Sequence, residues 1–430
     1  MTMRQEKSTV DRTREKSAVQ SETAMGRRRS RILFVSHSGN LYGAERSLLT
    51  LLKGLKAADK YEILTYLPHE GDFSRVLAEE NINFRIFPYS RWIGLRLHAA
   101  ARYLRRLRNR WYITQLLNDA EKWNPDAIYT NTLATPVGAM LTCRLVRRPF
   151  HIWHARELPG EKKHAFGLFD WGFRDSFRFI AQTSDRFICN SRFLMEKLMP
   201  FLEQEMPGIS ENRMHVVYNG FEQQETGGVP GTIMQKKRES GEVFRIVMAG
   251  GIGSRKNYGE AVRGISMLVG EGNAVKLDIY GSGSTSALRQ LKREITAESL
   301  GDHVALMGYH QNILPVISRS DLLLITSRME TFGRVAVEAM LAGCPVVSSD
   351  AGALPEIIHD GKTGLLYRSG DPEHLARQIK KLMNDPNLGT NLAQKAADFA
   401  SKEFSSDRFV AGIHRILQET LFSKKGGRPI

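Results

Sequence analysis

The stretch DLLLITSRMETFGRVAVEAMLAGCPVVSSD, residues 321–350, decides the fold. It contains the apolar run 322–325, a run of good helix formers over 333–342, and the short β-branched stretch PVVSS at 345–349. A buried strand, a helix and another buried strand in this order form a right-handed βαβ unit of a parallel sheet. The residues that follow the first strand then lie at its carboxyl end, where such sheets bind ligands.

The same alternation of short β-branched runs and helical stretches runs from Arg31 to about residue 220 and restarts after residue 242. The sequence therefore predicts an α/β protein with two Rossmann-like, doubly wound domains that face each other across a cleft. A polar segment that contains Gly and Pro and lacks periodicity separates them, which indicates a linker. The expected parts are a disordered basic arm (1–29), an N-terminal Rossmann-like domain (30–221), the linker (222–242), a C-terminal Rossmann-like domain (243–400), and a C-terminal helix and tail that can pack back on the N-terminal domain (401–430).

The composition agrees with a large globular protein. The chain has 430 residues, which predicts two to three domains. Cys143, Cys189 and Cys344 are too far apart for a disulfide framework or a zinc knuckle. The apolar runs are a few residues long, whereas a membrane-spanning helix needs about 20, and residues 1–29 lack the apolar region of a secretory signal. We therefore expect a cytoplasmic protein.

The positive charge is concentrated in two segments. The chain carries 61 Lys and Arg against 46 Asp and Glu, a net charge of +15. Residues 1–31 are basic, and residues 91–112 hold seven arginines and no acid, interleaved with aromatic and aliphatic side chains. Such a basic amphipathic stretch predicts peripheral docking on the anionic inner face of the cell membrane. The alternative is a core helix with a basic exposed face. RNA binding is less favoured, because no nucleic-acid module accompanies the stretch.

Two glutamates eight positions apart flank the start of the helix at 333–342. Glu330 ends the loop after the strand, and Glu338 lies about two helical turns further on the same side. A helix N-terminus with a glycine offers free N–H groups to a phosphate, and the carboxylates can accept hydrogen bonds from sugar and ribose hydroxyls. The alternative is that Glu330 caps the helix and Glu338 is a solvated surface residue.

Seven motifs in a fixed order make the sequence similar to a known family. They are GAE (43–45), HARE (154–157), VVYNGF (216–221), GGIGSRKN (250–257), YGSG (280–283), ETFGRVAVEAMLAGCPVVSSDAGALPEII (330–358) and DGKTGLLY (360–367). Together they resemble the retaining nucleotide-sugar glycosyltransferases of family 4, which have the GT-B fold. The resemblance covers about 390 residues.

The resemblance implies a role for several residues of the motifs. Glu330 is expected to contact the transferred sugar near its reacting carbon, and Glu338 the ribose hydroxyls. Lys256 matches the lysine that holds the diphosphate, where a cation suits the developing leaving-group charge. Phe332 and Gly333 are expected to offer backbone N–H groups to the donor. The other donor-binding residues expected from the resemblance are Gly43, Arg255, Gly281, Tyr309 and Thr331.

The sequence departs from the family pattern at two glycine-rich loops. The family usually has Gly-Arg where this chain has Gly250 and Gly251, and Arg255 can substitute for the missing arginine. The family more often has Gly-Gly-Ala-Glu where this chain has Tyr42 before Gly43. The second change affects the shape of the loop and leaves the entry to the helix unchanged.

A histidine ends the strand FHIWH. His154 is expected to face the cleft as a catalytic residue that binds the donor sugar or the acceptor, and a structural histidine is the alternative. His151 is three positions earlier, so its side chain should point to the opposite face. The chain has no Asp-x-Asp pair, which metal-dependent transferases use to hold Mg²⁺ or Mn²⁺. We therefore expect no metal and no cofactor besides the donor, a UDP- or GDP-sugar.

The resemblance thus implies a metal-independent, retaining hexosyltransferase, with the acceptor bound by the N-terminal domain and the nucleotide-sugar donor by the C-terminal domain. Its expected acceptor is a glycan or a lipid-linked glycan, in the biosynthesis of cell-surface polysaccharide or lipopolysaccharide. One alternative is a catalytically silent scaffold protein that binds a nucleotide sugar or a glycan. Another is a nucleotide-sugar epimerase of similar fold, which would need a different set of acid and base residues.

Overall fold

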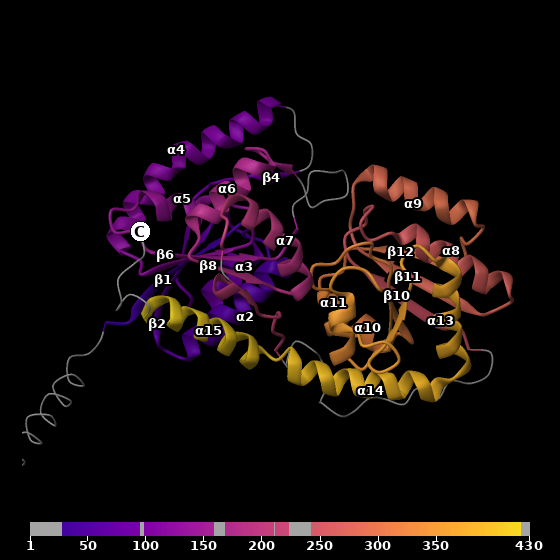
Figure 1. Ribbon diagram of the computed structural model, residues 1–430. Coiled ribbons are helices and arrows are strands. Elements are labelled where there is room, and N and C mark those ends of the chain that lie inside the picture. Colours follow the sequence, from indigo (N-terminus) through magenta and orange to yellow (C-terminus); the bar gives the residue numbers. More distant parts are fainter. Residues whose placement is uncertain (1–27, 95–98, 159–167, 210, 223–241, 423–430) are drawn as a thin grey trace, which may run out of the picture.

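The computed structural model describes residues 28–94, 99–158, 168–209, 211–222 and 242–422. These residues form two α/β domains, coloured indigo to magenta and orange to yellow in Figure 1. Each is built on a parallel sheet, which confirms the predicted fold class. Most of the predicted arm and linker, and the end of the predicted tail, lie outside the described residues.

The N-terminal sheet has the strand order β3-β2-β1-β5-β6-β8-β9, and all its strands are parallel. The order reverses between β1 and β5, so the loops after these strands diverge and leave a crevice. Its elements are β1 (Ser30–Ser36), α2 (Gly43–Ala57), β2 (Tyr61–Leu67), α3 (Asp72–Glu79), β3 (Phe84–Ile86), β4 (Ile93–Gly94), α4 (Ala99–Trp123), β5 (Ala127–Asn131), α5 (Val137–Arg144), β6 (Phe150–Ala155), β7 (Leu168–Phe169), α6 (Phe173–Thr183), β8 (Arg186–Cys189), α7 (Arg192–Glu205), the 3₁₀ turn η1 (Glu211–Arg213) and β9 (Met214–Val216).

Helices cover both faces of this sheet. Along β1, Leu33 and Val35 point to the side of α4 and α5, whereas Ile32 and Phe34 point to the side of α2 and α15. Successive side chains of a strand point to opposite faces, and all four are fully buried. This double burial explains why the strands read as continuous apolar runs.

A two-stranded antiparallel ribbon, β4 and β7, was not expected from the sequence. Each strand has two residues, too few for a periodic pattern. The ribbon places Trp92 under α4, where its backbone N–H donates to Ala134 O at 3.0 Å and its carbonyl accepts from Asp170 N at 2.7 Å.

The C-terminal sheet has the order β12-β11-β10-β13-β14-β15, also fully parallel, with the reversal between β10 and β13. The strand β15 and the short helix α12 go beyond the predicted elements. The elements are β10 (Phe244–Ala249), α8 (Tyr258–Gly270), β11 (Val275–Tyr280), α9 (Thr285–Ala297), β12 (Val304–Gly308), α10 (Leu314–Arg319), β13 (Leu322–Ile325), α11 (Arg334–Leu341), β14 (Val346–Ser349), α12 (Leu354–Ile357), β15 (Leu365–Tyr367), α13 (Pro372–Asn384), α14 (Pro386–Glu403) and α15 (Ser406–Phe422).

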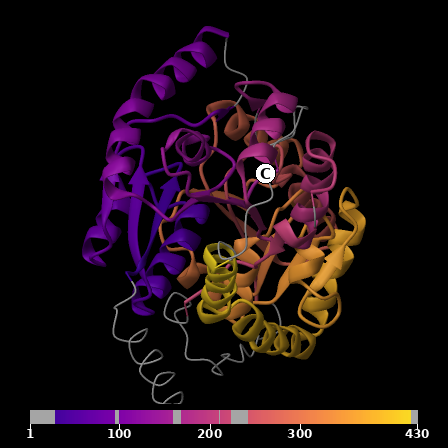
Figure 2. The same ribbon diagram turned by 60° about the vertical axis from the view of Figure 1, so that its left-hand side comes forward.

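The last helix, α15, returns from the C-terminal domain to the N-terminal domain. It runs beneath the N-terminal sheet in Figure 1, and Figure 2 shows the same path from the side. Its Phe409 and Ile413 join the core around α2. A Cβ at Gly54 would lie 2.5 Å from the Val410 side chain, so only glycine lets the two helices approach this closely. The chain end therefore ties the two domains together.

Candidate active site

A cleft of about 1130 Å³ lies between the two domains. The loops after β1, β5 and β6 line it from the N-terminal domain, and the loops after β10, β11, β12 and β13 line it from the C-terminal domain. The points at which both sheets reverse their strand order thus open into one space. The lining contains ten of the predicted site residues: Gly43, Arg255, Lys256, Gly281, Tyr309, Glu330, Thr331, Phe332, Gly333 and Glu338.

The centre of the C-terminal wall is an ion pair between Lys256 and Glu330. The Lys256 ammonium donates a hydrogen bond to Glu330 Oε1, which also accepts from Ser327 Oγ at 2.8 Å. Burial alone would raise the pKa of Glu330, but Lys256, Ser327 and Arg255 outweigh it and hold that pKa below its usual value. Glu330 is therefore an ionised carboxylate whose charge is shared with two cations.

The helix α11 begins directly beside this pair. Gly333 precedes its first residue with φ +96°, a left-handed conformation that favours glycine. The Phe332 ring packs against Phe221 and Phe404, with centroids 6.3 Å and 5.7 Å away, so only its backbone is available to a ligand. Glu338 lies further along α11, half-buried, with Oε1 3.5 Å from Arg334 Nη2. The helix start and both glutamates therefore share one wall of the cleft.

The glycine-rich loops after β10 and β11 touch each other. A Cβ at Gly281 would lie 1.9 Å from Gly250 O, so a side chain there would force the loops apart. Gly250 has φ +144°, and a Cβ on it would lie 3.2 Å from Lys256 Cε. Both glycines are therefore needed for the backbone geometry that positions Lys256. Tyr309, on the loop after β12, is exposed at the cleft.

Hydrogen bonds cross between the two domains near the cleft. Arg334 Nη1 donates to Ser47 Oγ of α2 at 2.8 Å, and Thr331 Oγ1 donates to Arg156 O at 2.7 Å. Glu356 accepts the backbone N–H groups of Arg192 and Phe193 at the start of α7, at 2.9 Å and 2.6 Å. A carboxylate at a helix N-terminus interacts favourably with the helix dipole. These contacts fix the relative positions of the two walls of the cleft.

The structure corrects the expected position of His154. Its side chain is fully buried and does not line the cleft. It contacts the Tyr129 hydroxyl and lies 3.3 Å from Arg156 Nη2. Burial, with a contribution from Arg156, holds the pKa of His154 well below its usual value, so the ring is neutral. A residue at the end of a strand lies near the cleft, but the sequence does not show whether its side chain reaches the cleft surface. Here His154 is buried and Arg156 lines the cleft. The side chain of His151 forms a hydrogen bond with the Thr130 hydroxyl on the opposite face of the sheet, as expected.

Arg156, two residues after His154 in the HARE motif, lines the cleft and was not predicted as a site residue. Its guanidinium donates to Asn131 Oδ1 at 2.7 Å and to Asn219 Oδ1. Burial lowers the pKa of Arg156 to about 10, which leaves it charged at neutral pH. The pattern that indicates this residue is the charged pair Arg156 and Glu157, directly after a strand and within a family motif. Only His154 of this motif was predicted to be a site residue. Arg156 therefore presents a fixed cation from the N-terminal wall.

A second missed group on the same wall is an acid cluster around His37. Glu45, in the first turn of α2, is fully buried, and its Oε1 lies 2.9 Å from His37 Nδ1. Burial raises the pKa of Glu157 to about 7, although His37 and Arg156 oppose this. Burial alone would lower the pKa of His37, but Glu45 outweighs it and raises that pKa. His37, Glu45 and Glu157 all line the cleft.

The raised pKa of Glu157 predicts a pH-dependent change in stability. Folded Glu157 binds its proton up to about pH 7, whereas an unfolded glutamate loses it near 4.5, so its contribution is lost as pH rises through this window. Replacing Glu157 with Gln removes that loss. We expect the unfolding free energy of Glu157→Gln, relative to the unmodified protein, to rise by roughly 3 kcal/mol between pH 4.5 and 8.

Urea unfolding at a series of pH values measures this difference. The buried His151 and His154 stay neutral in the folded state of both proteins and take up protons only on unfolding, so their effect cancels in the comparison. The other charges facing Glu157, those of His37, Glu45 and Arg156, are retained. A difference that stays constant across the window would contradict the assigned pKa.

The described residues contain no group of three His, Cys, Asp or Glu side chains that could hold a metal ion. Nor is any helix in the described part of the chain long and apolar enough to cross a membrane.

Two protein families match the chain, one for each domain. The family described as "Glycosyltransferase Family 4" matches residues 42–225, and the one described as "Glycosyl transferases group 1" matches residues 231–399. The paired parallel sheets and the cleft at their reversal points define the GT-B fold. The two family matches together span both domains and confirm the resemblance to the family 4 glycosyltransferases found in the motifs.

Curated relatives match parts of the chain. It is 31% identical over 174 residues to N-acetyl-alpha-D-glucosaminyl L-malate synthase of Bacillus anthracis, an alignment that covers 40% of this chain and 45% of that protein. It is 30% identical over 196 residues to poly(glycerol-phosphate) alpha-glucosyltransferase of Bacillus subtilis, covering 44% and 29%. The matched part thus spans less than half the length of each relative.

Solved structures share the fold over nearly the whole chain. HepE of Anabaena in complex with UDP has a TM-score of 0.71 and 23% sequence identity, covering 90% of this chain and 100% of that one. The lipopolysaccharide outer core galactosyltransferase WaaB has a TM-score of 0.66 and 16% identity, covering 92% and 99%. At these identities the likeness shows the GT-B fold alone.

Proposed function

We propose that the protein is a retaining glycosyltransferase that moves a hexosyl group from a UDP- or GDP-sugar to a glycan or lipid-linked acceptor. We further propose that it acts in the assembly of cell-surface polysaccharide or lipopolysaccharide. The observation that carries the proposal is the Lys256–Glu330 ion pair beside the start of α11, in a cleft between two Rossmann-like domains. Cations and free helix N–H groups suit a diphosphate, and an ionised carboxylate beside them suits the sugar attached to it.

The proposed chemistry follows from this arrangement. Lys256 and Arg255 neutralise the charge that develops on the diphosphate as its bond to the sugar carbon breaks. The acceptor oxygen forms a bond to that carbon on the same face, and its proton passes to the departing phosphate oxygen. Glu330 orients the sugar, and its negative charge stabilises the positive charge on the ring. The acceptor enters from the N-terminal wall, where Arg156 and Glu157 lie.

Two alternatives make different predictions. A silent binding scaffold would bind the nucleotide sugar without consuming it, whereas an epimerase would change the sugar without releasing the nucleotide. The shared cleft supports a transferase over a silent scaffold, because the lysine and both glutamates line it.

The decisive experiment is a screen of UDP-, GDP- and ADP-sugars for thermal stabilisation, followed by an assay for release of the nucleoside diphosphate. A donor at 100 times its Kd stabilises the protein by roughly 2.7 kcal/mol. If a donor stabilises the protein but no nucleoside diphosphate is released when an acceptor is present, the scaffold is favoured.

We expect the reaction to proceed without a metal ion. In the proposed chemistry Lys256 and Arg255 neutralise the diphosphate, a role that a metal ion has in metal-dependent transferases. The transfer rate should therefore be the same in excess EDTA as in buffer with Mg²⁺, measured with the donor found in the screen. A rate that collapses with EDTA and returns with Mn²⁺ would overturn the metal-free chemistry.

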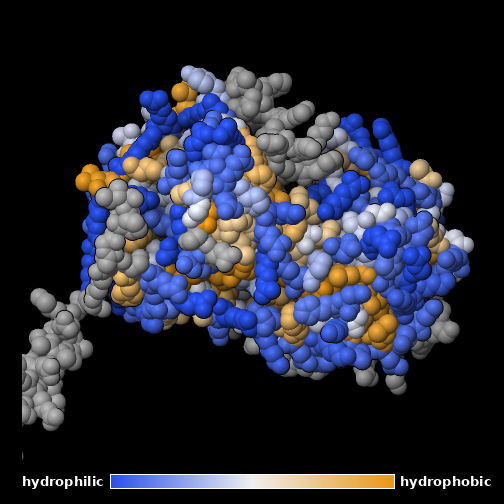
Figure 3. Space-filling model, in the orientation of Figure 1, coloured by the Kyte–Doolittle hydropathy of each residue, from blue (hydrophilic) through white to orange (hydrophobic). Residues whose placement is uncertain are grey.

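We also propose that α4 docks the protein on an anionic membrane. The helix lies on the outer side of the N-terminal domain, away from the C-terminal domain, in both Figure 1 and Figure 2. Its inner face packs Ile113 and Leu116 into the core, while Leu104 and Trp111 are 63% and 65% exposed. Figure 3 shows hydrophobic residues interspersed with hydrophilic ones along this upper-left edge. Exposed aromatic and aliphatic side chains among cations are typical of interfacial helices.

Several arginines of the segment 91–112 also hold α4 in place. Arg105 forms an ion pair with Asp170, Arg106 donates to the Asp170 backbone carbonyl, and Arg108 donates to Ser90 Oγ. Replacing them would disturb the domain as well as its surface charge. The apolar side chains therefore give a cleaner test of docking.

We expect Trp111→Ser to weaken binding to anionic vesicles by about tenfold, because a buried aromatic side chain contributes 1.5–3 kcal/mol or so. Co-sedimentation with vesicles of phosphatidylglycerol and phosphatidylcholine measures this. Val146→Ser, which removes an apolar side chain that is 93% exposed elsewhere on the same domain, is the matched control. Binding that is equal for both variants, or equal on purely neutral vesicles, would leave α4 as a structural helix with a basic face.

A further inference from the structure

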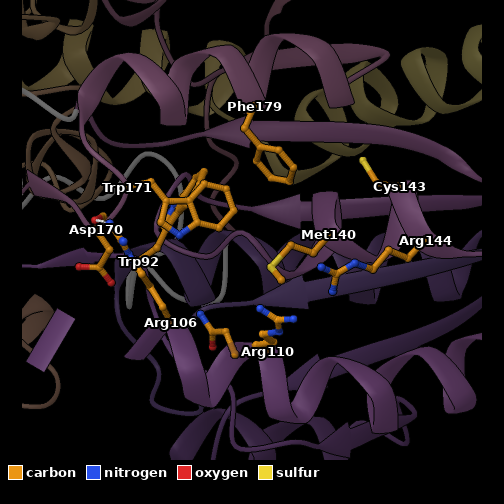
Figure 4. Close-up of a pocket in the computed structure, with 10 residues that line it drawn as sticks. Trp92, Arg106, Arg110, Met140, Cys143, Arg144, Asp170, Trp171 and Phe179 are labelled. Atoms are coloured by element: carbon orange, nitrogen blue, oxygen red, sulfur yellow. Dashed lines mark hydrogen bonds between the residues drawn. The ribbon is translucent and has the colours of Figure 1, made fainter. Parts of the chain in front are cut away.

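A second cavity, of about 520 Å³, lies beneath α4 and apart from the cleft. Its walls come from α4, α5 and α6 and from the residues beside the β4–β7 ribbon (Figure 4). Trp92 lines this cavity, whereas its neighbours Arg91 and Ile93 line the cleft. The two spaces therefore lie on opposite sides of one stretch of backbone. Nothing in the proposed transfer reaction uses the second one.

One wall of this cavity is aromatic. Trp171 packs edge-on against Trp92 and against Phe179, with ring centroids 4.9 Å and 5.1 Å apart, and Met140 adjoins them in the lining. Trp92 and Met140 are buried, while Trp171 and Phe179 are partly accessible. Such a wall takes up an apolar chain or a ring, and offers little to a free inorganic ion.

The opposite rim is cationic. Arg106 and Arg110 of α4 and Arg144 of α5 line the cavity, and Figure 4 shows the Arg110 and Arg144 side chains reaching toward Met140. Within the described part of the chain, neither Arg110 nor Arg144 forms a hydrogen bond or an ion pair. The acid in the lining, Asp170, is already paired with Arg105. The rim therefore holds an excess of positive charge that complements an anion.

We propose that this cavity binds the phosphate headgroup of an anionic membrane phospholipid. The phosphate lies against Arg110 and Arg144, and the glycerol and first acyl carbons lie against the aromatic wall. Each lining arginine of α4 directly precedes an exposed apolar side chain, Leu107 after Arg106 and Trp111 after Arg110. The cavity thus adjoins the surface that we propose docks on the membrane. Two arginines are the usual partners of a phosphate, and the apolar wall distinguishes a lipid from free phosphate.

This inference rests on the membrane part of the proposed function and is independent of the transfer reaction. It is tested with soluble lipid, so neither vesicle binding nor enzymatic activity enters the result. Cys143 provides the probe, because it lines the cavity and is exposed, whereas Cys189 and Cys344 are buried. Partial burial raises the pKa of Cys143, so a maleimide is used at mildly alkaline pH.

The experiment measures the rate of Cys143 labelling with and without dihexanoyl phosphatidylglycerol below its micelle concentration. At about ten times its Kd, the lipid should slow labelling about tenfold. Dihexanoyl phosphatidylcholine and inorganic phosphate should each protect far less. The Arg110→Gln/Arg144→Gln variant should lose the protection, and Arg75→Gln/Arg415→Gln, which removes the same charge from exposed helices elsewhere, should keep it.

The ratio of the two labelling rates is compared for each protein, because Arg144 itself influences the pKa of Cys143. Equal protection by phosphate alone would overturn the lipid assignment in favour of a simple anion site. Equal protection by the neutral lipid, or protection that survives the loss of both arginines, would overturn the role of the rim. No protection by any of the three compounds would overturn the proposal as a whole.

Discussion

Replacing Glu330 with alanine is expected to lower the transfer rate by about a thousandfold, the loss typical of a residue that acts in the transition state. Affinity for the nucleoside diphosphate should stay the same or increase. In the folded protein the Glu330 carboxylate accepts a hydrogen bond from Lys256 and contributes negative charge beside Arg255. Its removal leaves both cations available to the diphosphate. Initial rates at saturating donor and calorimetric titration with the nucleoside diphosphate measure the two effects separately.

Glu338→Ala is the matched comparison, because it removes a carboxylate from the same wall. Glu338 lies on α11 beyond Gly333 and pairs with Arg334, whereas Glu330 pairs with Lys256. We expect Glu338 to bind the ribose. This variant should lose about tenfold in nucleotide affinity, as for one hydrogen bond to a charged group. Its rate at saturating donor should stay close to normal. Equal losses of nucleotide affinity in the two variants would contradict this division of roles.

The parallel sheets were predictable because buried strands leave a simple pattern. The run 322–325 and the helix formers over 333–342 appear in the structure as β13 and α11, and β10 and β13 form the reversal point of the C-terminal sheet. The β4–β7 ribbon could not be predicted. It has two residues per strand, and its strands pair through tertiary contacts around Trp92. Very short strands have no periodicity of their own.

The C-terminal wall of the site could be read from its motifs, because Lys256, Glu330 and Gly333 lie on loops that meet at one sheet edge. The N-terminal wall could not. The alternation along β6 correctly placed His151 and His154 on opposite faces, but it does not indicate depth. Arg156 reaches the cleft because Asn131 and Asn219, distant in sequence, hold its guanidinium.

The basic segment shows a related limit. Its charge and its helical character could be read from composition and spacing. The partner of Arg105 could not, because Asp170 is 65 positions away and lies next to a ribbon that the sequence does not reveal. Charge patterns predict a surface, whereas tertiary contacts decide which of its cations remain available to a ligand.

Lys256→Ala should reduce kcat/KM for the donor by about a hundredfold or more, as expected for loss of a cation aimed at a developing charge. Unlike Glu330→Ala, it should also weaken binding of the nucleoside diphosphate, because we propose that Lys256 contacts the diphosphate in both ground and transition states. Arg255 remains in this variant and provides the residual activity. A Lys256→Ala protein with normal kcat/KM would shift the assignment of the diphosphate site to Arg255.

Restoring the arginine that the family usually has should recover part of this loss. Gly251 lines the cleft and is exposed, and a Cβ on it would meet only Ser282 O, at 3.9 Å. Gly250, by contrast, has φ +144° and cannot take a side chain without strain. We expect Gly251→Arg to raise kcat/KM about tenfold in the Lys256→Ala background, since one charge-assisted hydrogen bond contributes 1.5–3 kcal/mol or so. Gly253→Arg adds the same charge to the same loop outside the cleft lining, with no atoms within 4 Å of its Cβ. Equal recovery by both arginines would mean that the loop acts through its general charge, whereas recovery specific to position 251 would place the diphosphate at this loop.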